Sequence, residues 1–447
     1  MPHRIAVIGG GAAGFFAAIR AKEVNPDAIV TIYEKGERPL AKVAITGGGR
    51  CNLTNSFANV SDLKRVYPRG DKLMKRLFKS FDYQDTFRWF ESHGVPLVTQ
   101  DDQCVFPRSQ DAMSIVRCLT NEARRLGVSI LTKHALTNIV RENDKTFLLF
   151  NNGEKRIETE RVIITTGGHP KSSSFDYLAR LGHEISAPVP SLFTFNINDK
   201  SLRSLMGTVV ENATIGIVGE KMRSEGPLLI THWGMSGPAV LKLSSYAARF
   251  SHEHQYRFSV SVNWIGESNT SIIADIIRTT AEANASKFVA NAQPFIQQRN
   301  NGIATSISHT ALNTQHSTRS KGSLSQSEAN ERSLPTRLWD YLMQKIGLPA
   351  DKRWNETGKK WQNKIVEVLA NDIYHVEGKS SWREEFVTCG GVSLSSINPS
   401  TLESKHLPGL YFAGEVTDVD AITGGFNLQA AWTMGYIAGE NAARPHS

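Results

Sequence analysis

The chain has 447 residues, of which 40% are hydrophobic and 21% charged, and this ordinary globular composition predicts about two to three domains with large apolar cores. No apolar run approaches the roughly 18 residues of a membrane span, and glycines interrupt the short apolar N-terminus, unlike a signal peptide, so a cytoplasmic protein is expected. The net charge of +8 is modest for this length, and the four cysteines lack metal-ligand or C-x-x-C spacing, which predicts reduced, mostly buried thiols and no metal site.

Residues 4–34 show, in order, the features of a dinucleotide-binding β-α-β unit. An apolar strand over 4–8 leads into Gly9-Gly10-Gly11-Ala12-Ala13-Gly14, a helix follows over 12–24, and a second strand over 29–33 ends at Glu34. Such glycines allow a tight turn and bring the backbone close to a pyrophosphate, which the helix N-terminus attracts. Glu34 follows at about the spacing of a carboxylate that binds a ribose hydroxyl. The alternative is a glycine-rich turn that binds nothing. We expect dinucleotide contacts at Gly9, Gly11, Ala12, Ala13, Gly14 and Glu34.

A second glycine-rich segment follows a polar loop predicted over 35–42. Residues 45–55 read Ile-Thr-Gly-Gly-Gly-Arg-Cys-Asn-Leu-Thr-Asn, which is a poor helix and a poor strand. Successive glycines can press backbone N–H groups against a ligand, and Arg50 adds a positive charge. The alternative is a flexible surface loop.

This segment resembles the S/T-G-G-G-R-C-N-x-T-N signature of the BaiN/RdsA family of FAD-dependent oxidoreductases, also called the aminoacetone oxidase family. Residues 231–238 and 387–392 resemble two further family segments, T-H-x-G-x-S-G-P and V-T-x-G-G-V, so the resemblance covers nearly the whole chain. It implies an FAD cofactor. We expect further cofactor contacts at Lys35, Lys42, Gly48, Arg50 and Asn52.

Residues 64–79 are strongly basic, with Asp71 as the one acid. A solvated helix face is the favoured interpretation, and the alternatives are an anionic substrate or a nucleic-acid surface. The basic residues are Lys64, Arg65, Arg69, Lys72, Lys75, Arg76 and Lys79.

The stretch from 72 to 168 predicts alternating helices and short strands. Helices are expected over 72–93 and 111–126, with a strand over 104–109 between them. Three strands, over 129–132, 136–140 and 146–150, predict a small antiparallel layer, and the resemblance places the adenine of FAD near Ala135. The apolar strand over 161–166 resembles the strand that returns to the dinucleotide-binding sheet in this class of flavoproteins, which implies that Gly167 contacts the cofactor; the alternative is an ordinary βα junction.

Residues 191–266 alternate apolar and polar side chains and predict a β-rich insert domain. His232 lies there in a glycine-bracketed turn, where it either contacts the substrate as a catalytic group or only satisfies turn carbonyls. Residues 267–380 predict a helical subdomain, with a polar connector at 302–335.

The C-terminal stretch predicts a return to the first domain. A strand over 410–412 leads to Gly414 and Glu415, and a glycine pair at 424–425 opens a helix that reaches about residue 443. A second helix N-terminus would favour negative charge on a flavin ring, so this pairing indicates FAD rather than NAD alone. Further contacts are expected at Gly414, Glu415, Gly425, Asn427 and Leu428.

The predicted fold is α/β: a three-layer, glutathione-reductase-like Rossmann domain for FAD or NAD(P), formed by 1–190 and 381–447, with the β-rich insert and the helical subdomain between them. The predicted function is hydride transfer between a small organic substrate and flavin N5. Because only one full fingerprint is present, the second redox partner is oxygen or a transiently bound NAD(P)H. The alternative is a flavin-containing protein that binds or modifies nucleic acid such as tRNA. A membrane partner is not expected.

Overall fold

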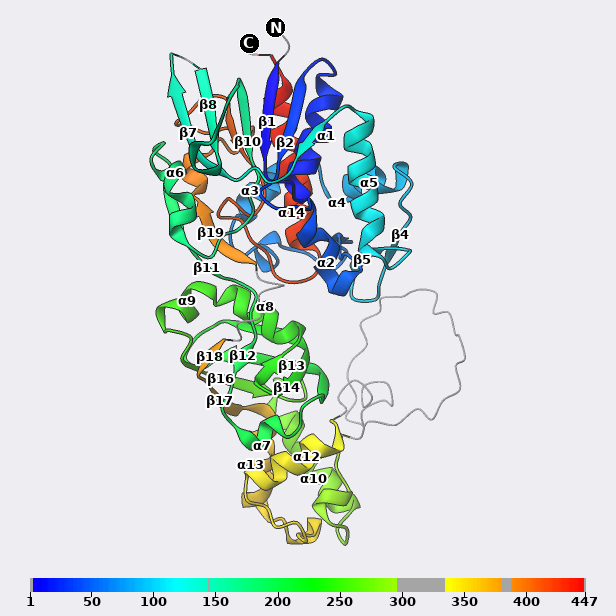
Figure 1. Ribbon diagram of the computed structural model, residues 1–447. Helices are drawn as coiled ribbons and strands as arrows, with labels where there is room; N and C mark the ends of the chain where they lie inside the picture. Colours follow the sequence, from blue (N-terminus) through cyan, green and yellow to red (C-terminus); the bar gives the residue numbers. More distant parts are fainter. Residues whose placement is uncertain (1–2, 144, 296–333, 380–386, 446–447) are drawn as a thin grey trace. The chain divides into compact units, whose positions relative to one another are not determined.

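The computed structural model describes residues 3–143, 145–295, 334–379 and 387–445 (Figure 1). Its contacts divide the chain into two compact units. The first comprises 1–192, 244–252 and 381–447, and the second comprises 193–243 and 253–380. No helix in these described ranges is long and apolar enough to cross a membrane.

A parallel sheet forms the centre of the first unit, in the strand order β20-β10-β1-β2-β6. Apolar side chains occupy both faces of β1 and β10, as a strand covered by other elements on each face requires. The prediction for 129–132 was wrong in its pairing, because this strand continues the parallel sheet beside β2. The strands are β1 (Arg4–Ile8), β2 (Ile29–Tyr33), β6 (Ser129–Leu131), β10 (Arg161–Ile164) and β20 (Leu410–Phe412).

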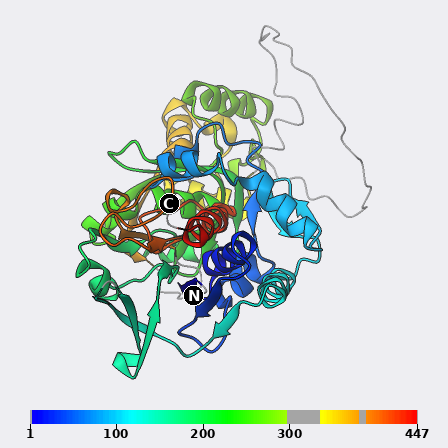
Figure 2. The same cartoon turned by 90° about the horizontal axis from the view of Figure 1, so that it is seen from above.

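Two helices from opposite ends of the sequence pack against each other in the first unit. They are α1 (Ala12–Val24) and α14 (Phe426–Ala443), which Figure 2 shows side by side in blue and red. Glycines make this approach possible, because a Cβ at Gly439 would lie only 2.2 Å from the carbonyl oxygen of Ala17. Both predicted helices are confirmed, and their contact unites the two ends of the chain in one core.

The predicted helix over 72–93 is two helices, α3 (Asp71–Leu77) and α4 (Tyr83–Ser92). Asp82 begins α4 by accepting hydrogen bonds from the backbone of Gln84 and Asp85, so the chain turns between the two. The other elements of this unit are α2 (Ala41–Gly49), β3 (Thr54–Asn55), η1 (Leu63–Arg65), β4 (Leu97–Thr99), β5 (Cys104–Pro107), α5 (Ala112–Arg125), β7 (Leu136–Glu142), β8 (Lys145–Phe150), η2 (Asn151–Gly153), β9 (Lys155–Thr159), η3 (Ser172–Phe175), α6 (Asp176–Ala179), β11 (Ile185–Pro190), β19 (Thr388–Val392) and η6 (Leu394–Ser396).

The second unit is built on a seven-stranded antiparallel sheet in the order β17-β16-β13-β14-β15-β12-β18. Its strands are β12 (Phe195–Asn196), β13 (Val209–Ile217), β14 (Arg223–Thr231), β15 (Gly234–Ser236), β16 (Phe258–Asn263), β17 (Asp372–Val376) and β18 (Gly378–Lys379). Its helices are α7 (Lys200–Arg203), α10 (Thr270–Ala283), η4 (Val289–Asn291), α12 (Thr336–Lys345), η5 (Trp354–Glu356) and α13 (Lys359–Ala370).

This division differs from the predicted one in two respects. The strands at 372–379 join the sheet, so the segments 191–266 and 267–380 form one compact unit rather than a sheet domain and a helical subdomain. Residues 244–252, which include parts of α8 (Pro238–Tyr246) and α9 (Ala248–Glu253), belong to the first unit by their contacts. Most of the predicted connector, 302–333, lies outside the described residues.

Candidate cofactor site

The turn between β1 and α1 combines tight packing with one open position. A Cβ at Gly9, whose φ is +111°, would lie 2.4 Å from the carbonyl oxygen of Thr165, and a Cβ at Gly14 would lie 2.0 Å from that of Gly9. At Gly11, the N-cap of α1, no atom lies within 4 Å of the corresponding position. The position at the N-terminus of α1 is therefore open at Gly11, which fits an anionic group such as a pyrophosphate.

Glu34 is held in place by the glycine loop itself. Its two carboxylate oxygens accept hydrogen bonds from the backbone N–H groups of Gly10 and Gly36, each at 2.7 Å. Each oxygen keeps a further lone pair, because a carboxylate oxygen can accept two hydrogen bonds. The carboxylate is thus oriented and can still accept a hydrogen bond, and its contact with a ribose hydroxyl stays a prediction.

The C-terminal glycine and acid meet the first glycine loop. Glu415 accepts hydrogen bonds from the backbone of Thr388 at 2.8 Å and from Lys42 Nζ at 3.3 Å. A Cβ at Gly414 would lie 3.0 Å from that of Ala13, and one at Gly167 would lie 3.8 Å from Glu415 Oε2. The structure therefore brings together predicted site residues that are hundreds of positions apart in the sequence.

His169 belongs to this cluster, although it was not among the residues predicted from the sequence. Burial, with the positive charges of Lys35 and Lys42, lowers the pKa of its imidazole to about 4, although Glu415 opposes the shift. The ring is therefore neutral at physiological pH. A titratable residue directly after a glycine pair at the end of a parallel strand was the signal that could have identified it.

The Gly-Gly-Gly-Arg segment ends α2 in a left-handed turn, so α2 begins inside the predicted loop and breaks at Thr46. Gly47, Gly48 and Gly49 have φ values of +57°, +67° and +82°, and a Cβ at Gly48 or Gly49 would have no neighbour within 4 Å. Arg50 lies over the Phe106 ring at 4.4 Å and bonds the carbonyl of Gly47. Exposed N–H groups on such a turn suit an anionic or acceptor-rich ligand.

An unpaired acceptor lies at the start of α14. Asn52 Oδ1 is buried and has no hydrogen-bond partner within the described part of the chain. A Cβ at Gly425, the N-cap of α14, would lie 2.8 Å from this oxygen. Because leaving a buried acceptor unpaired costs about 1–3 kcal/mol, this position fits a ligand N–H group beside a helix N-terminus.

The loop that precedes α14 is anchored by a buried ion pair between Arg69 and Asp420. Arg69 also donates to the carbonyl oxygen of Ser245 at 2.9 Å, and Ser191 donates to Asp420. Burial raises the pKa of the Asp420 carboxyl, while Arg69 opposes that shift. Arg69 is therefore a structural residue rather than part of the exposed basic face.

At several predicted cofactor contacts, the polar groups are already hydrogen-bonded to other residues of the protein. Asn151 pairs with both the N–H and the C=O of Ala135, so the predicted adenine contact has no unpaired backbone group there. The Asn427 amide pairs at both ends with the backbone of Ala421 and holds the loop before α14. Leu428 is half-buried. Their contacts with a cofactor stay predictions.

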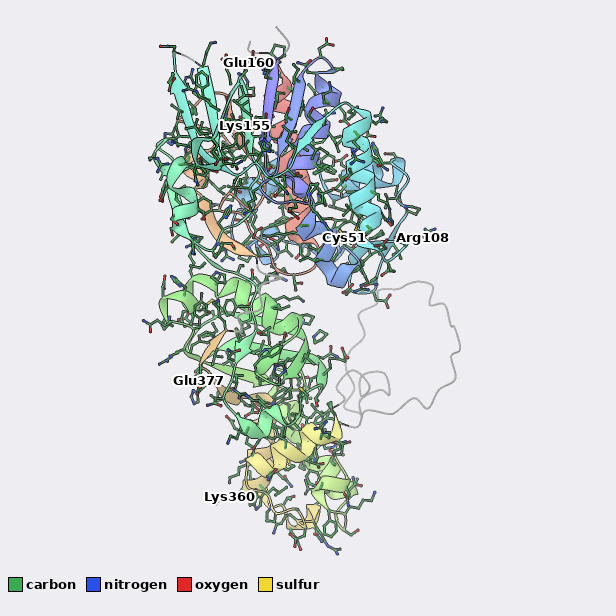
Figure 3. All side chains as sticks on the ribbon, viewed as in Figure 1. Cys51, Arg108, Lys155, Glu160, Lys360 and Glu377 are labelled. Atoms are coloured by element: carbon green, nitrogen blue, oxygen red, sulfur yellow. The ribbon has the colours of Figure 1, made fainter. Side chains whose placement is uncertain are left out.

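Cys51, labelled in Figure 3, is buried, and burial raises the pKa of its thiol to about 12. The four cysteines are free and three are buried, as predicted. His232 lies in the second unit, in the turn between β14 and β15. It is exposed, with its ring 4.3 Å from that of Trp233, and its catalytic role stays a prediction.

Residues 3–441 match the family described as HI0933-like protein Rossmann domain, and the chain belongs to this family. It is 29% identical to a 3-dehydro-bile acid delta(4,6)-reductase of Clostridium scindens over 99% of both chains. It is 26% identical to a ribosomal RNA dihydrouridine synthase of Escherichia coli over 97% of this chain and 96% of that protein. A 3-ketosteroid-delta4-(5alpha)-dehydrogenase from Rhodococcus jostii has 14% identity and a TM-score of 0.48, over 99% of this chain and 97% of that one.

The family match confirms the predicted resemblance and the Rossmann fold class. The similarity to an enzyme named as a reductase agrees with the predicted oxidoreductase class.

Proposed function

We propose that this protein is an FAD-dependent reductase of a carbon–carbon double bond that is conjugated to a carbonyl group. The observation that carries the proposal is the packing of α1 on α14, which unites two glycine-bounded helix N-termini with Glu34 and Asn52. One helix end suits a pyrophosphate and the other suits a ring that becomes negative on reduction.

The names of two relatives favour reduction over oxidation. One acts on the delta(4,6) bonds of a 3-oxo bile acid, and the other makes dihydrouridine, which is uridine with a saturated ring double bond. Both double bonds are conjugated to a carbonyl. This shared chemistry supports an unsaturated carbonyl compound as the substrate class of this chain.

The residues of the first unit have distinct roles in this proposal. Gly11 and the start of α1 bind the pyrophosphate of FAD, and Glu34 accepts a hydrogen bond from a ribose hydroxyl. Glu415 and Lys42 bind the polar chain that joins the pyrophosphate to the flavin ring. The start of α14 stabilises negative charge, and Asn52 Oδ1 accepts a ring N–H. FAD, when bound, supplies hydride chemistry at flavin N5. NAD(P)H is the proposed electron donor.

Anaerobic stopped-flow spectroscopy tests this proposal. NADH or NADPH should bleach the flavin absorbance of the purified protein quickly, and a 3-oxo-4-ene steroid or uridine should restore it faster than oxygen does. Slow bleaching by both nicotinamides, followed by fast reoxidation with oxygen, would identify an oxidase and contradict the proposal.

RNA as the substrate is a second candidate, and an exposed basic surface favours it. Six basic side chains on and around η1 and α3 are exposed, and none forms an ion pair with any described residue. Two of the relatives are named for a reaction on ribosomal RNA. The six residues are Lys64, Arg65, Lys72, Lys75, Arg76 and Lys79.

Gel mobility of ribosomal RNA fragments separates the two substrate classes. If RNA binds, its mobility shift should weaken as salt increases, because contacts between basic side chains and phosphates supply the affinity. The triple charge reversal of Lys72, Lys75 and Arg76 to Glu removes such contacts and should abolish the shift. Reversal of the exposed Lys359 and Lys360 on α13 is the matched control. Unchanged RNA mobility with the wild-type protein at low salt would exclude this candidate.

A further inference from the structure

A row of polar side chains crosses the antiparallel sheet of the second unit. The strand register pairs Asn196 of β12 with Gly234 of β15, and Gly234 with Thr231 of β14. Directly opposite residues of antiparallel strands point to the same face. Asn196 and Thr231 therefore share one face with a glycine between them, and Thr194, two residues before Asn196, points the same way.

The opposite face of these three strands is apolar. Phe195, Met235 and Ile230 occupy the alternate positions, and each is 0% exposed. This alternation fixes which face belongs to the core, because a slip of one residue would exchange every side chain. The polar row is thus a property of the other face.

The polar atoms of the row are buried without partners. Thr194 Oγ1, Asn196 Oδ1 and Thr231 Oγ1 have no hydrogen bond to any residue that the structure describes, and Thr231 as a whole is only 7% exposed. Buried polar atoms are nearly always paired in folded proteins, and an unpaired one destabilises the fold. Three on one face indicate groups that await a ligand.

Space lies beside Asn196 on one side. Its partners on both neighbouring strands are glycines, Gly234 and Gly378, so no side chain flanks the amide across either strand. A Cβ at Gly234 would lie 2.3 Å from the carbonyl oxygen of Phe195, so backbone fills that side. A Cβ at Gly378 would meet nothing closer than Asn196 Nδ2 at 3.7 Å, so the room is on the Gly378 side.

The chemistry of the row selects an uncharged ligand. A threonine hydroxyl can donate or accept, a carboxamide does both at separate atoms, and none of the three side chains is ionised. A ligand carbonyl oxygen can accept from the two threonine hydroxyls, and an adjacent ligand N–H group can donate to Asn196 Oδ1, whereas a carboxylate or phosphate finds no charge to compensate its own.

We propose that Thr194, Asn196 and Thr231 form a subsite of the second unit that binds the carbonyl end of an uncharged organic ligand. The inference rests on the proposed function in identifying this ligand as the unsaturated carbonyl substrate. The carbonyl belongs either to a ring ketone or to the imide of a uracil ring, and binding of 4-androstene-3,17-dione or of uridine separates these sources.

The test compares Thr231→Val and Asn196→Leu with the control Thr214→Val, which makes the same change at a half-buried position of β13 in the same sheet. Thermal unfolding of the FAD-loaded full chain is followed with increasing 4-androstene-3,17-dione or uridine, because a ligand that binds the folded state raises the midpoint. One of the two probes should bind the wild type. Its Kd should rise about 3- to 10-fold in each row variant and stay unchanged in the control.

A readout without ligand separates a binding role from a structural one. Thr231→Val removes an unpaired buried hydroxyl, so the midpoint of the ligand-free variant should stay equal to or exceed that of the wild type. A lower midpoint, an unchanged Kd in both variants, or no binding of either probe would overturn the inference. Flavin reduction by NAD(P)H and reoxidation by an unsaturated ketone do not depend on this readout, so failure of the subsite leaves the proposed function standing.

Discussion

The two units treat their polar groups in opposite ways. In the first unit, backbone N–H groups fix Glu34 and Glu415 by hydrogen bonds, and the Asn427 side chain is hydrogen-bonded to the backbone of the loop before α14. In the second unit, the row at Asn196 and Thr231 has no partner among the described residues. Most polar side chains of the candidate cofactor site are therefore fixed before a ligand binds, with Asn52 Oδ1 as the exception, whereas the row is satisfied only by a ligand. Preorganisation suits a cofactor that stays bound, and unpaired groups suit a substrate that leaves.

The largest effect should follow from breaking the anchor of the cofactor unit. Asp420→Asn leaves the buried Arg69 charge without its carboxylate, and loss of one partner of such a pair costs about 3–5 kcal/mol. Urea unfolding measures it. Glu37→Gln, which removes an exposed pair with Lys133, is the control and should cost less than about 1 kcal/mol. Equal losses in both variants would contradict preorganisation by a buried pair.

Two glycine variants sharpen the distinction between fold and ligand contact. Gly14→Ala places a Cβ against the backbone of Gly9, so it should cost about 3 kcal/mol and yield colourless protein. Gly11→Ala meets no atom, so stability without cofactor should fall by no more than about 1 kcal/mol, the cost of alanine at an N-cap. Flavin absorbance after purification and thermal unfolding of the apoprotein report the two effects. Full FAD content in Gly11→Ala would show that the pyrophosphate lies elsewhere.

The contact between α1 and α14 should tolerate no added atom. Gly439→Ala brings a Cβ into the Ala17 carbonyl, and the expected loss is about 2 kcal/mol in the free energy of unfolding. Gly358→Ala is the matched control, because a Cβ there has no neighbour within 4 Å and φ is −59°. If both variants unfold at the wild-type urea concentration, the two helices pack less closely than described.

The smallest effect concerns pH. The pKa of His169 is lowered to about 4 in the folded chain, against about 6.5 unfolded, so the unfolded chain binds more protons between these values. Stability should therefore fall as pH decreases from 6.5 toward 4. His169→Asn should flatten this part of the profile. Urea titrations of both proteins at pH 7 and pH 5 measure the change in the free energy of unfolding between the two pH values. An equal change in wild type and variant would contradict the role given to His169.

The sequence predicted the first unit better than the second. The β-α-β unit and both terminal helices follow from glycine spacing and apolar runs, which are local signals, and the same spacing placed Glu34 beside the glycine loop. The break between α3 and α4 was missed because aromatic residues on either side of Asp82 keep an approximately helical spacing across the turn. The three-residue strand β6 carries no signal that separates parallel from antiparallel pairing.

The row at Asn196 could not be predicted from the sequence, because the register of strand pairing decides which residues become neighbours. Asn196, Gly234 and Thr231 become neighbours only when β12, β15 and β14 pair as they do. The strand β17 was missed for a related reason. Its five residues follow directly on α13, and their alternation is too short to stand out from the helix.

The close packing of α1 on α14 has a consequence for biosynthesis. The helix made first is buried over most of its surface, including Phe15, Phe16 and Ala17, but its covering helix leaves the ribosome more than 400 residues later. At about 5–20 residues per second, the nascent chain carries an uncovered apolar helix for at least about 20 seconds. The apolar surface of α1 is therefore open to aggregation until α14 has been made and has packed against it.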